Sequence, residues 1–192
     1  MSALNRICRA AKAFARDRRG VAAVEFAMIA PVMILGYVGT SELSTAMMTS
    51  RRISHSTSAI GDLLSQQQTT TKASVTDMLA AGAIIMQPFS TTPMGLRLTS
   101  ITLQSSGTNS GKTTVDWSDA NGSGLTALTK GTVISNATVT KLVTTANPSI
   151  VMADGVYAFT SPVPYFLPHG VAFSETFYLS PRYGSTITCA DC

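Results

Sequence analysis

The chain has 192 residues, of which 45% are hydrophobic, and a formal net charge of +4. That length allows one domain of modest size beside a membrane anchor. The positive charge belongs to residues 1–20, which hold six basic residues and one acidic residue, whereas residues 21–192 hold eight basic and nine acidic ones. Because the body groups no cations beyond Arg51 and Arg52, its composition argues against nucleic-acid binding.

An apolar run from Val21 to Gly39 follows the basic leader and predicts a transmembrane helix. Glu25 is the only charged residue in these 19 positions. A helix of that length covers about 28 Å, which is close to the hydrocarbon thickness of a bilayer. Lysine and arginine are more numerous before the run than directly after it. This asymmetry predicts a cytoplasmic amino terminus and a body on the other side of the membrane.

Glu25 distinguishes this apolar run from a simple membrane anchor, because an ionisable side chain in a membrane helix is more often functional than incidental. Its carboxylate needs a cation, and the sequence offers two. In an intact chain, Arg18 lies seven residues earlier on the same helical face. If a peptidase cuts after Gly20, the new α-ammonium group of Val21 lies four residues before Glu25, one turn away. The residues themselves leave both alternatives open.

Residues 18–27 read Arg-Arg-Gly-Val-Ala-Ala-Val-Glu-Phe-Ala, which resembles the start of TadE-like proteins, the minor pseudopilins of the tight-adherence (Tad, type IVc) pilus. The resemblance implies cleavage between Gly20 and Val21 by a prepilin peptidase, with Glu25 guiding the docking of the subunit. It implies other pilus subunits and inner-membrane lipid as partners, and a single-pass location in the bacterial inner membrane with a periplasmic head. Phe26 stands where major pilins of this class usually have tyrosine, which points to a minor component.

The helical period continues beyond Gly39 and predicts an extension of the helix under the body of the protein. The positions that recur at steps of three and four are Leu43, Met47, Ser50, Ile53, Thr57, Ile60 and Leu64. We expect the outer domain to pack on this stripe. Pro31 should bend the helix mildly. After a polar connector at residues 66–71, Ser74 predicts the start of a second helix that ends at Met86, before Pro88.

The remaining residues show the alternation of strands. Residues 96–103 and 113–117 flank a glycine-containing loop, which predicts a hairpin. Residues 150–159 and 171–179 predict two further strands, separated by a loop with Pro162, Pro164 and Pro168. Residues 121–145 give no clear assignment. The polar faces of the strands carry Thr and Ser rather than Lys and Glu, so a bare edge of the sheet could associate with sister subunits.

The predicted fold class is α+β and pilin-like: one long amino-terminal helix, a short second helix and a small, mainly antiparallel sheet of about four strands. We divide the chain into a cytoplasmic leader (1–20), a transmembrane helix (21–41), a helical region (42–90) and a β-rich extracytoplasmic head (91–192).

Two motifs suggest chemistry that the rest of the chain does not support. Residues 106–113 resemble a phosphate-binding loop, but Ser106 replaces the first glycine and a strand follows instead of a helix. Cys189 and Cys192 form a single Cys-x-x-Cys pair, and a zinc site would need two more ligands. Outside the cytoplasm we expect this pair to form a disulfide, while Cys8 stays unpaired in the cytoplasm.

The sequence shows no arrangement of nucleophile, base and orienting group. His55 and His169 stand alone, and the carboxylates of Asp116, Asp119, Asp154 and Glu175 are scattered and expected at the surface. We therefore expect no enzyme, no metal, no cofactor and no small-molecule substrate.

Two alternatives to a pilus assembly protein remain. One is an uncleaved single-pass protein whose Thr-rich head binds a ligand or a surface glycan. The other is a soluble exported enzyme, cut by signal peptidase near Ser44-Thr45-Ala46. The length of the apolar run and the charge of Glu25 argue against the second alternative.

Overall fold

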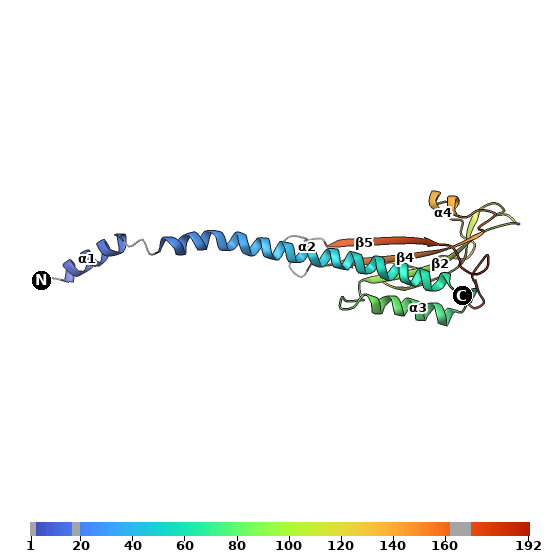
Figure 1. The fold of residues 1–192 in the computed structure, drawn as a ribbon, viewed down its shortest axis with the longest axis horizontal. Coiled ribbons are helices and arrows are strands. Elements are labelled where there is room, and N and C mark those ends of the chain that lie inside the picture. Colours follow the sequence, from blue (N-terminus) through green and yellow to red (C-terminus); the bar gives the residue numbers. More distant parts are fainter. Residues whose placement is uncertain (1–2, 17–19, 162–169) are drawn as a thin grey trace. The chain divides into compact units, whose positions relative to one another are not determined.

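The computed structural model describes residues 3–16, 20–161 and 170–192, and Figure 1 shows its elements in chain order. Its helices are α1 (Ala3–Arg16), α2 (Val21–Ser65), α3 (Lys72–Ile85) and α4 (Ala137–Leu142). Its strands are β1 (Thr69–Thr70), β2 (Met94–Leu103), β3 (Thr113–Gly122), β4 (Ser149–Phe159), β5 (Val171–Leu179) and β6 (Thr188–Cys189). The chain forms two compact units, Met1–Leu43 and Ser44–Cys192. The α+β class is confirmed, with one long helix, a short one and a small antiparallel sheet.

The long helix α2 runs without interruption for 45 residues and contains Pro31. Its most apolar window has a mean hydropathy of 2.0, and none of that window is buried within the structure. The exposed apolar side chains in this part are Val21, Val24, Phe26, Met28, Ile29, Val32, Met33, Ile34 and Leu35. Because an uncovered apolar surface of this length is unfavourable in water, the first half of α2 indicates membrane anchoring.

The second unit contains a four-stranded sheet in the order β3-β2-β4-β5. All three neighbouring pairs are antiparallel, so the predicted hairpin and the two further strands are confirmed. The carboxyl half of α2 and the helix α3 run alongside these strands (Figure 1). One hydrophobic cluster joins Ile60 and Leu64 of α2, Leu79 of α3, and Leu98 and Val151 of the sheet.

The buried residues of α2 recur with the 3.6-residue period of an α-helix, even where the residue at a buried position is small or polar. Ile53, Thr57, Ile60 and Leu64 are buried, as predicted. Leu43 and Met47 are 60% and 50% exposed, so their place in the predicted stripe is wrong. Counting back from Ile53 in steps of about 3.6 residues reaches positions 49 and 46, and Thr49 and Ala46 are the buried residues there.

The helix α3 begins at Lys72, two residues before the predicted start at Ser74. Thr71 is its N-cap, and the Thr71 side-chain oxygen accepts a hydrogen bond from the backbone N–H of Ser74 at 3.2 Å. That hydroxyl satisfies one of the free amide groups of the first turn. Between the two helices, Ser56 Oγ donates to the carbonyl oxygen of Gly82 at 2.7 Å.

The segment between β3 and β4, which the sequence left unassigned, covers part of the opposite face of the sheet. Val139 lies in α4 and Val143 directly follows this helix. Both pack in a second hydrophobic cluster against the sheet residues Ile101, Ile150 and Met152. The sheet is therefore apolar on both faces at this end.

Helix α2 approaches the sheet closely because a glycine lies beneath it. A Cβ atom built on Gly155 would overlap Thr57 Oγ1, and it would lie 3.3 Å from Ile53 Cδ1. We expect Gly155→Ala to lower the free energy of unfolding by about 1 to 3 kcal/mol, the usual cost of overpacking. Chemical denaturation of the detergent-solubilised chain measures this change.

The same substitution should cost less in a Thr57→Ala background, because the overlapping Oγ1 atom is then absent. Gly36→Ala is the matched control, since a Cβ there would meet nothing within 4 Å. If Gly155→Ala lowers the free energy of unfolding equally with and without Thr57→Ala, then α2 does not approach the sheet closely at Gly155.

Candidate functional site

The first candidate site is the start of α2. Gly20 immediately precedes the helix, and its carbonyl oxygen accepts a hydrogen bond from Val24 N at 3.1 Å. A Cβ on Gly20 would meet nothing within 4 Å, and Gly20 is not among the glycines with positive φ. Among the described residues, neither packing nor backbone conformation demands a glycine here.

Glu25 lies one turn after Val21 on this exposed part of the helix. The Val21 and Phe26 side chains are 51% and 72% exposed, so all three groups are accessible in a single copy of the chain. No salt bridge within the described residues involves Glu25. Arg18, the partner expected in an intact chain, lies outside the described residues. The structure thus presents a carboxylate that another charged group can reach.

The carboxyl-terminal cysteines form a second feature. Cys189 and Cys192 are joined by a disulfide with a Cα–Cα distance of 5.6 Å, while Cys8 is a free, exposed thiol. Asp191 lies between the two bonded cysteines. Its Oδ1 accepts a hydrogen bond at 2.8 Å from the backbone N–H of Lys72, the first residue of α3. The end of the chain therefore attaches to the start of a helix, and its sulfur atoms are not available as thiolate ligands.

The chain end is also held by backbone pairing. Strand β6 pairs in parallel with β1, with Thr69 opposite Thr188 and Thr70 opposite Cys189. A strand of two residues is too short to show alternation, so this contact is not predictable from the sequence.

The segment that resembles a phosphate-binding loop is the turn of the β2–β3 hairpin. Gly107 and Gly111 have φ values of +85° and +76°, which glycine adopts readily. Strand β3 begins at Thr113, directly after this turn. The hairpin interpretation is confirmed, and no helix start faces the loop.

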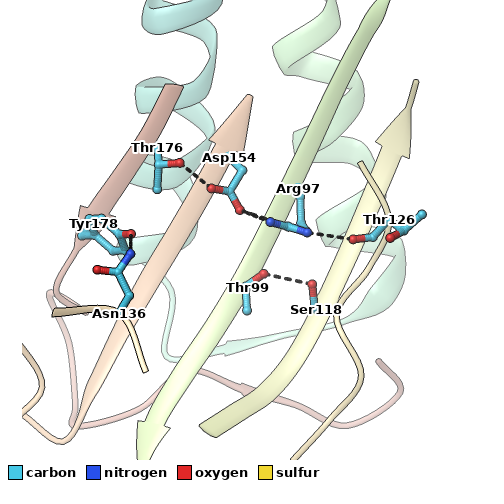
Figure 2. Close-up of polar contacts among 8 residues, drawn as sticks. All are labelled: Arg97, Thr99, Ser118, Thr126, Asn136, Asp154, Thr176 and Tyr178. Atoms are coloured by element: carbon cyan, nitrogen blue, oxygen red, sulfur yellow. Dashed lines mark hydrogen bonds and ion pairs between the residues drawn. The ribbon is translucent and has the colours of Figure 1, made fainter. Parts of the chain in front are cut away.

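The outer face of the sheet carries a polar network centred on Arg97 and Asp154 (Figure 2). Arg97 Nη2 lies 2.8 Å from Asp154 Oδ2, and the two side chains are only 16% and 9% exposed. Thr176 Oγ1 donates to Asp154 Oδ1 at 2.7 Å, and Arg97 Nη1 donates to the Thr126 carbonyl oxygen at 3.0 Å. Since the ion pair satisfies both charges within the protein, its role is structural.

The expectation that Asp154 lies at the surface is therefore wrong. Its position in β4, directly opposite Arg97 in β2, places it inside the network, and no local pattern predicts that register. Close by, Tyr178 accepts a hydrogen bond from Asn136 Nδ2 at 3.2 Å. Burial and then the charge of Asp154 raise the pKa of Tyr178, so its phenol stays protonated at neutral pH.

Among the described residues, His55 does not join a cluster of chemical groups. His55 is exposed on α2, and His169 lies outside the described residues, as do Pro162, Pro164 and Pro168. Of the other carboxylates, Asp116 lies 3.7 Å from Lys130 Nζ, and Asp119 Oδ1 accepts a hydrogen bond from Ala120 N.

One comparison with known proteins covers the amino-terminal segment. Residues 20–62 match the family described as TadE-like protein, whereas no curated protein and no solved structure matches the chain. The matched segment begins at Gly20 and includes Val21, Glu25 and Phe26, followed by most of α2. Residues 20–62 are thus a TadE-like segment, which confirms the resemblance seen in residues 18–27.

Proposed function

We propose that this chain is a minor pseudopilin-like assembly protein of a Tad-type pilus. The single observation that carries the proposal is the family match that starts at Gly20, the residue directly before α2. In this proposal residues 1–20 are a cytoplasmic leader, residues 21–41 cross the bacterial inner membrane, and residues 42–90 and 91–192 form the extension and the periplasmic head. The protein has no catalytic role in this assignment.

A prepilin peptidase would cut between Gly20 and Val21. The surroundings of Gly20 support this, because the described fold has room for a larger residue there. A glycine that the fold does not need is well explained by an enzyme that must fit the backbone closely. Cleavage would leave the exposed Val21 at the new amino terminus.

Glu25 would then guide docking beside other pilus subunits. The new α-ammonium group lies one turn from Glu25, in the same copy or in a neighbouring one. In the low dielectric of the membrane, an ion pair of this kind is far stronger than in water. Pairing with a cationic group therefore lowers the free energy of a subunit whose carboxylate is unpaired in the membrane.

Mass spectrometry of the protein taken from membranes of its own cells tests the cleavage. We expect a mature chain that begins at Val21. We also expect Gly20→Val to block cleavage without unfolding the protein, because a side chain at this position meets nothing within 4 Å.

Other amino termini would support the alternatives. An intact terminus near Met1 in wild-type membranes would argue for an uncleaved single-pass protein with a binding head. A terminus near Met47 would argue for a soluble exported protein.

A further inference from the structure

The two edges of the sheet differ in how they are protected. On the β3 edge, Val115 N donates to Thr132 O at 2.9 Å and Gly131 N donates to Val115 O at 2.8 Å. Ile134 N also donates to Thr113 O at 2.9 Å. The register of β2 and β3 shifts between Ser100 and Ile101. A covering segment and an irregularity of this kind are common ways to keep an edge from pairing with other chains.

The hydrogen-bond register shows which groups the β5 edge presents. Leu103 N donates to Pro148 O and Ala158 N donates to Pro93 O, so odd-numbered residues of β2 bond to even-numbered residues of β4. The odd-numbered residues of β4 therefore bond to the odd-numbered residues of β5 opposite them. It follows that the outward-directed backbone groups belong to Ala172, Ser174, Thr176 and Tyr178.

This row is open in the part of the chain that the structure describes. No backbone hydrogen bond from outside the sheet reaches residues 171–179 there. The strand contains no lysine or proline, and its one charged residue, Glu175, disfavours pairing only with strands that place no opposite charge beside it. Four residues thus offer a donor and an acceptor each to an added strand.

The side chains of β5 indicate what kind of strand fits. Phe173, Glu175 and Phe177 lie on one face of the sheet, opposite Tyr157, Gly155 and Ala153 of β4. This is the face toward α2, since Gly155 lies against Thr57 and Ala153 lies against Gly61. Glu175 is half-buried, and within the described residues it forms no salt bridge or hydrogen bond. A partner strand would set one side chain directly opposite each of these three residues.

Charge disfavours a second copy of the chain as the occupant. Two β5 strands paired antiparallel over their full length would place Glu175 opposite Glu175, with Cβ atoms about 4.5 to 5.5 Å apart. Like charges directly opposite each other destabilise a strand pair. The β3 edge of another copy is already covered by residues 131–134, so it does not offer an open row of backbone groups.

We propose that the open β5 edge is a docking site for an extended segment of a protein partner. The segment carries Lys or Arg opposite Glu175 and apolar side chains opposite Phe173 and Phe177. Backbone hydrogen bonds to the four outward residues provide affinity, and the three facing side chains provide specificity. This docking does not depend on cleavage after Gly20, so its test is separate from that of the proposed function.

The full-length chain in detergent micelles, titrated into two fluorescent peptides, tests the site. The first peptide is acetyl-Thr-Val-Thr-Lys-Thr-Val-Thr-amide, and the second has Glu in place of Lys. We expect the Lys peptide to bind about fivefold to tenfold more tightly than the Glu peptide. This is the change in affinity expected when an attractive cross-strand charge pair replaces a repulsive one. Glu175→Lys should reverse the preference.

A second pair of variants separates backbone pairing from surface adhesion. Ser174→Pro removes one outward N–H, and an edge strand tolerates proline where its N–H faces away from the sheet. It should abolish peptide binding, whereas Ser174→Ala should bind like the wild type. Equal binding of both peptides, binding of neither, or full binding by the proline variant would overturn the proposal, with circular dichroism verifying that each variant is folded.

Discussion

Cells whose only copy of this protein carries Glu25→Ala are expected to lack assembled pili, although the protein is still made, inserted and cleaved. The substitution removes the single charge from the apolar run of 19 residues, so insertion into the membrane should improve rather than fail. The head should fold normally, because Glu25 belongs to the unit Met1–Leu43 and the head belongs to Ser44–Cys192. Electron microscopy of cells provides the pilus count.

Two conservative variants distinguish charge from shape at this position. Glu25→Gln keeps the size of the side chain and should also abolish pili, since a neutral amide cannot pair with the α-ammonium group of Val21. Glu25→Asp keeps the charge on a shorter side chain and should retain part of the assembly. Normal pilus numbers with Glu25→Gln would remove the docking role, while a loss of cleavage would move the role of Glu25 to the peptidase.

Much of the fold follows from periodicity in the sequence. The long helix is visible from its apolar run and from the steps of three and four after Gly39, and the strands from short stretches such as residues 96–103, whose apolar residues alternate. The amino-terminal site is also readable, because Gly20, Val21 and Glu25 are close together in sequence. Local patterns of this kind need no knowledge of the tertiary structure.

Features that depend on pairing between distant segments were not predictable. Asp154 and Arg97 are 57 residues apart in sequence, and only the register of β2 with β4 brings them opposite each other. The open β5 edge likewise depends on strand order and on hydrogen-bond register. The exposure of Met47 shows a different failure, in which an apolar side chain was taken as evidence for a buried position.

Arg97→Met is expected to lower the free energy of unfolding by about 3 to 5 kcal/mol, the range found when one partner of a buried ion pair is removed. The carboxylate of Asp154 would remain only 9% exposed, with Thr176 as its donor and no compensating charge. Denaturant titration of the solubilised chain, followed by tryptophan fluorescence, measures the loss. Trp117 is a suitable reporter, since it is buried and its Nε1 donates to Ile187 O at 2.9 Å.

The double variant Arg97→Met with Asp154→Leu should recover most of that stability, because it leaves no buried charge. The Thr126 carbonyl group and the Thr176 hydroxyl group, which would lose their partners, belong to exposed residues and can bond to water. Lys130→Met is the matched control, because it breaks the ion pair between Lys130 and Asp116. The Lys130 side chain is 73% exposed and that of Asp116 is 31% exposed. At such exposure the pair is worth about 0 to 1 kcal/mol. If Arg97→Met costs no more than Lys130→Met, the network in Figure 2 is a surface feature and not a support of the sheet.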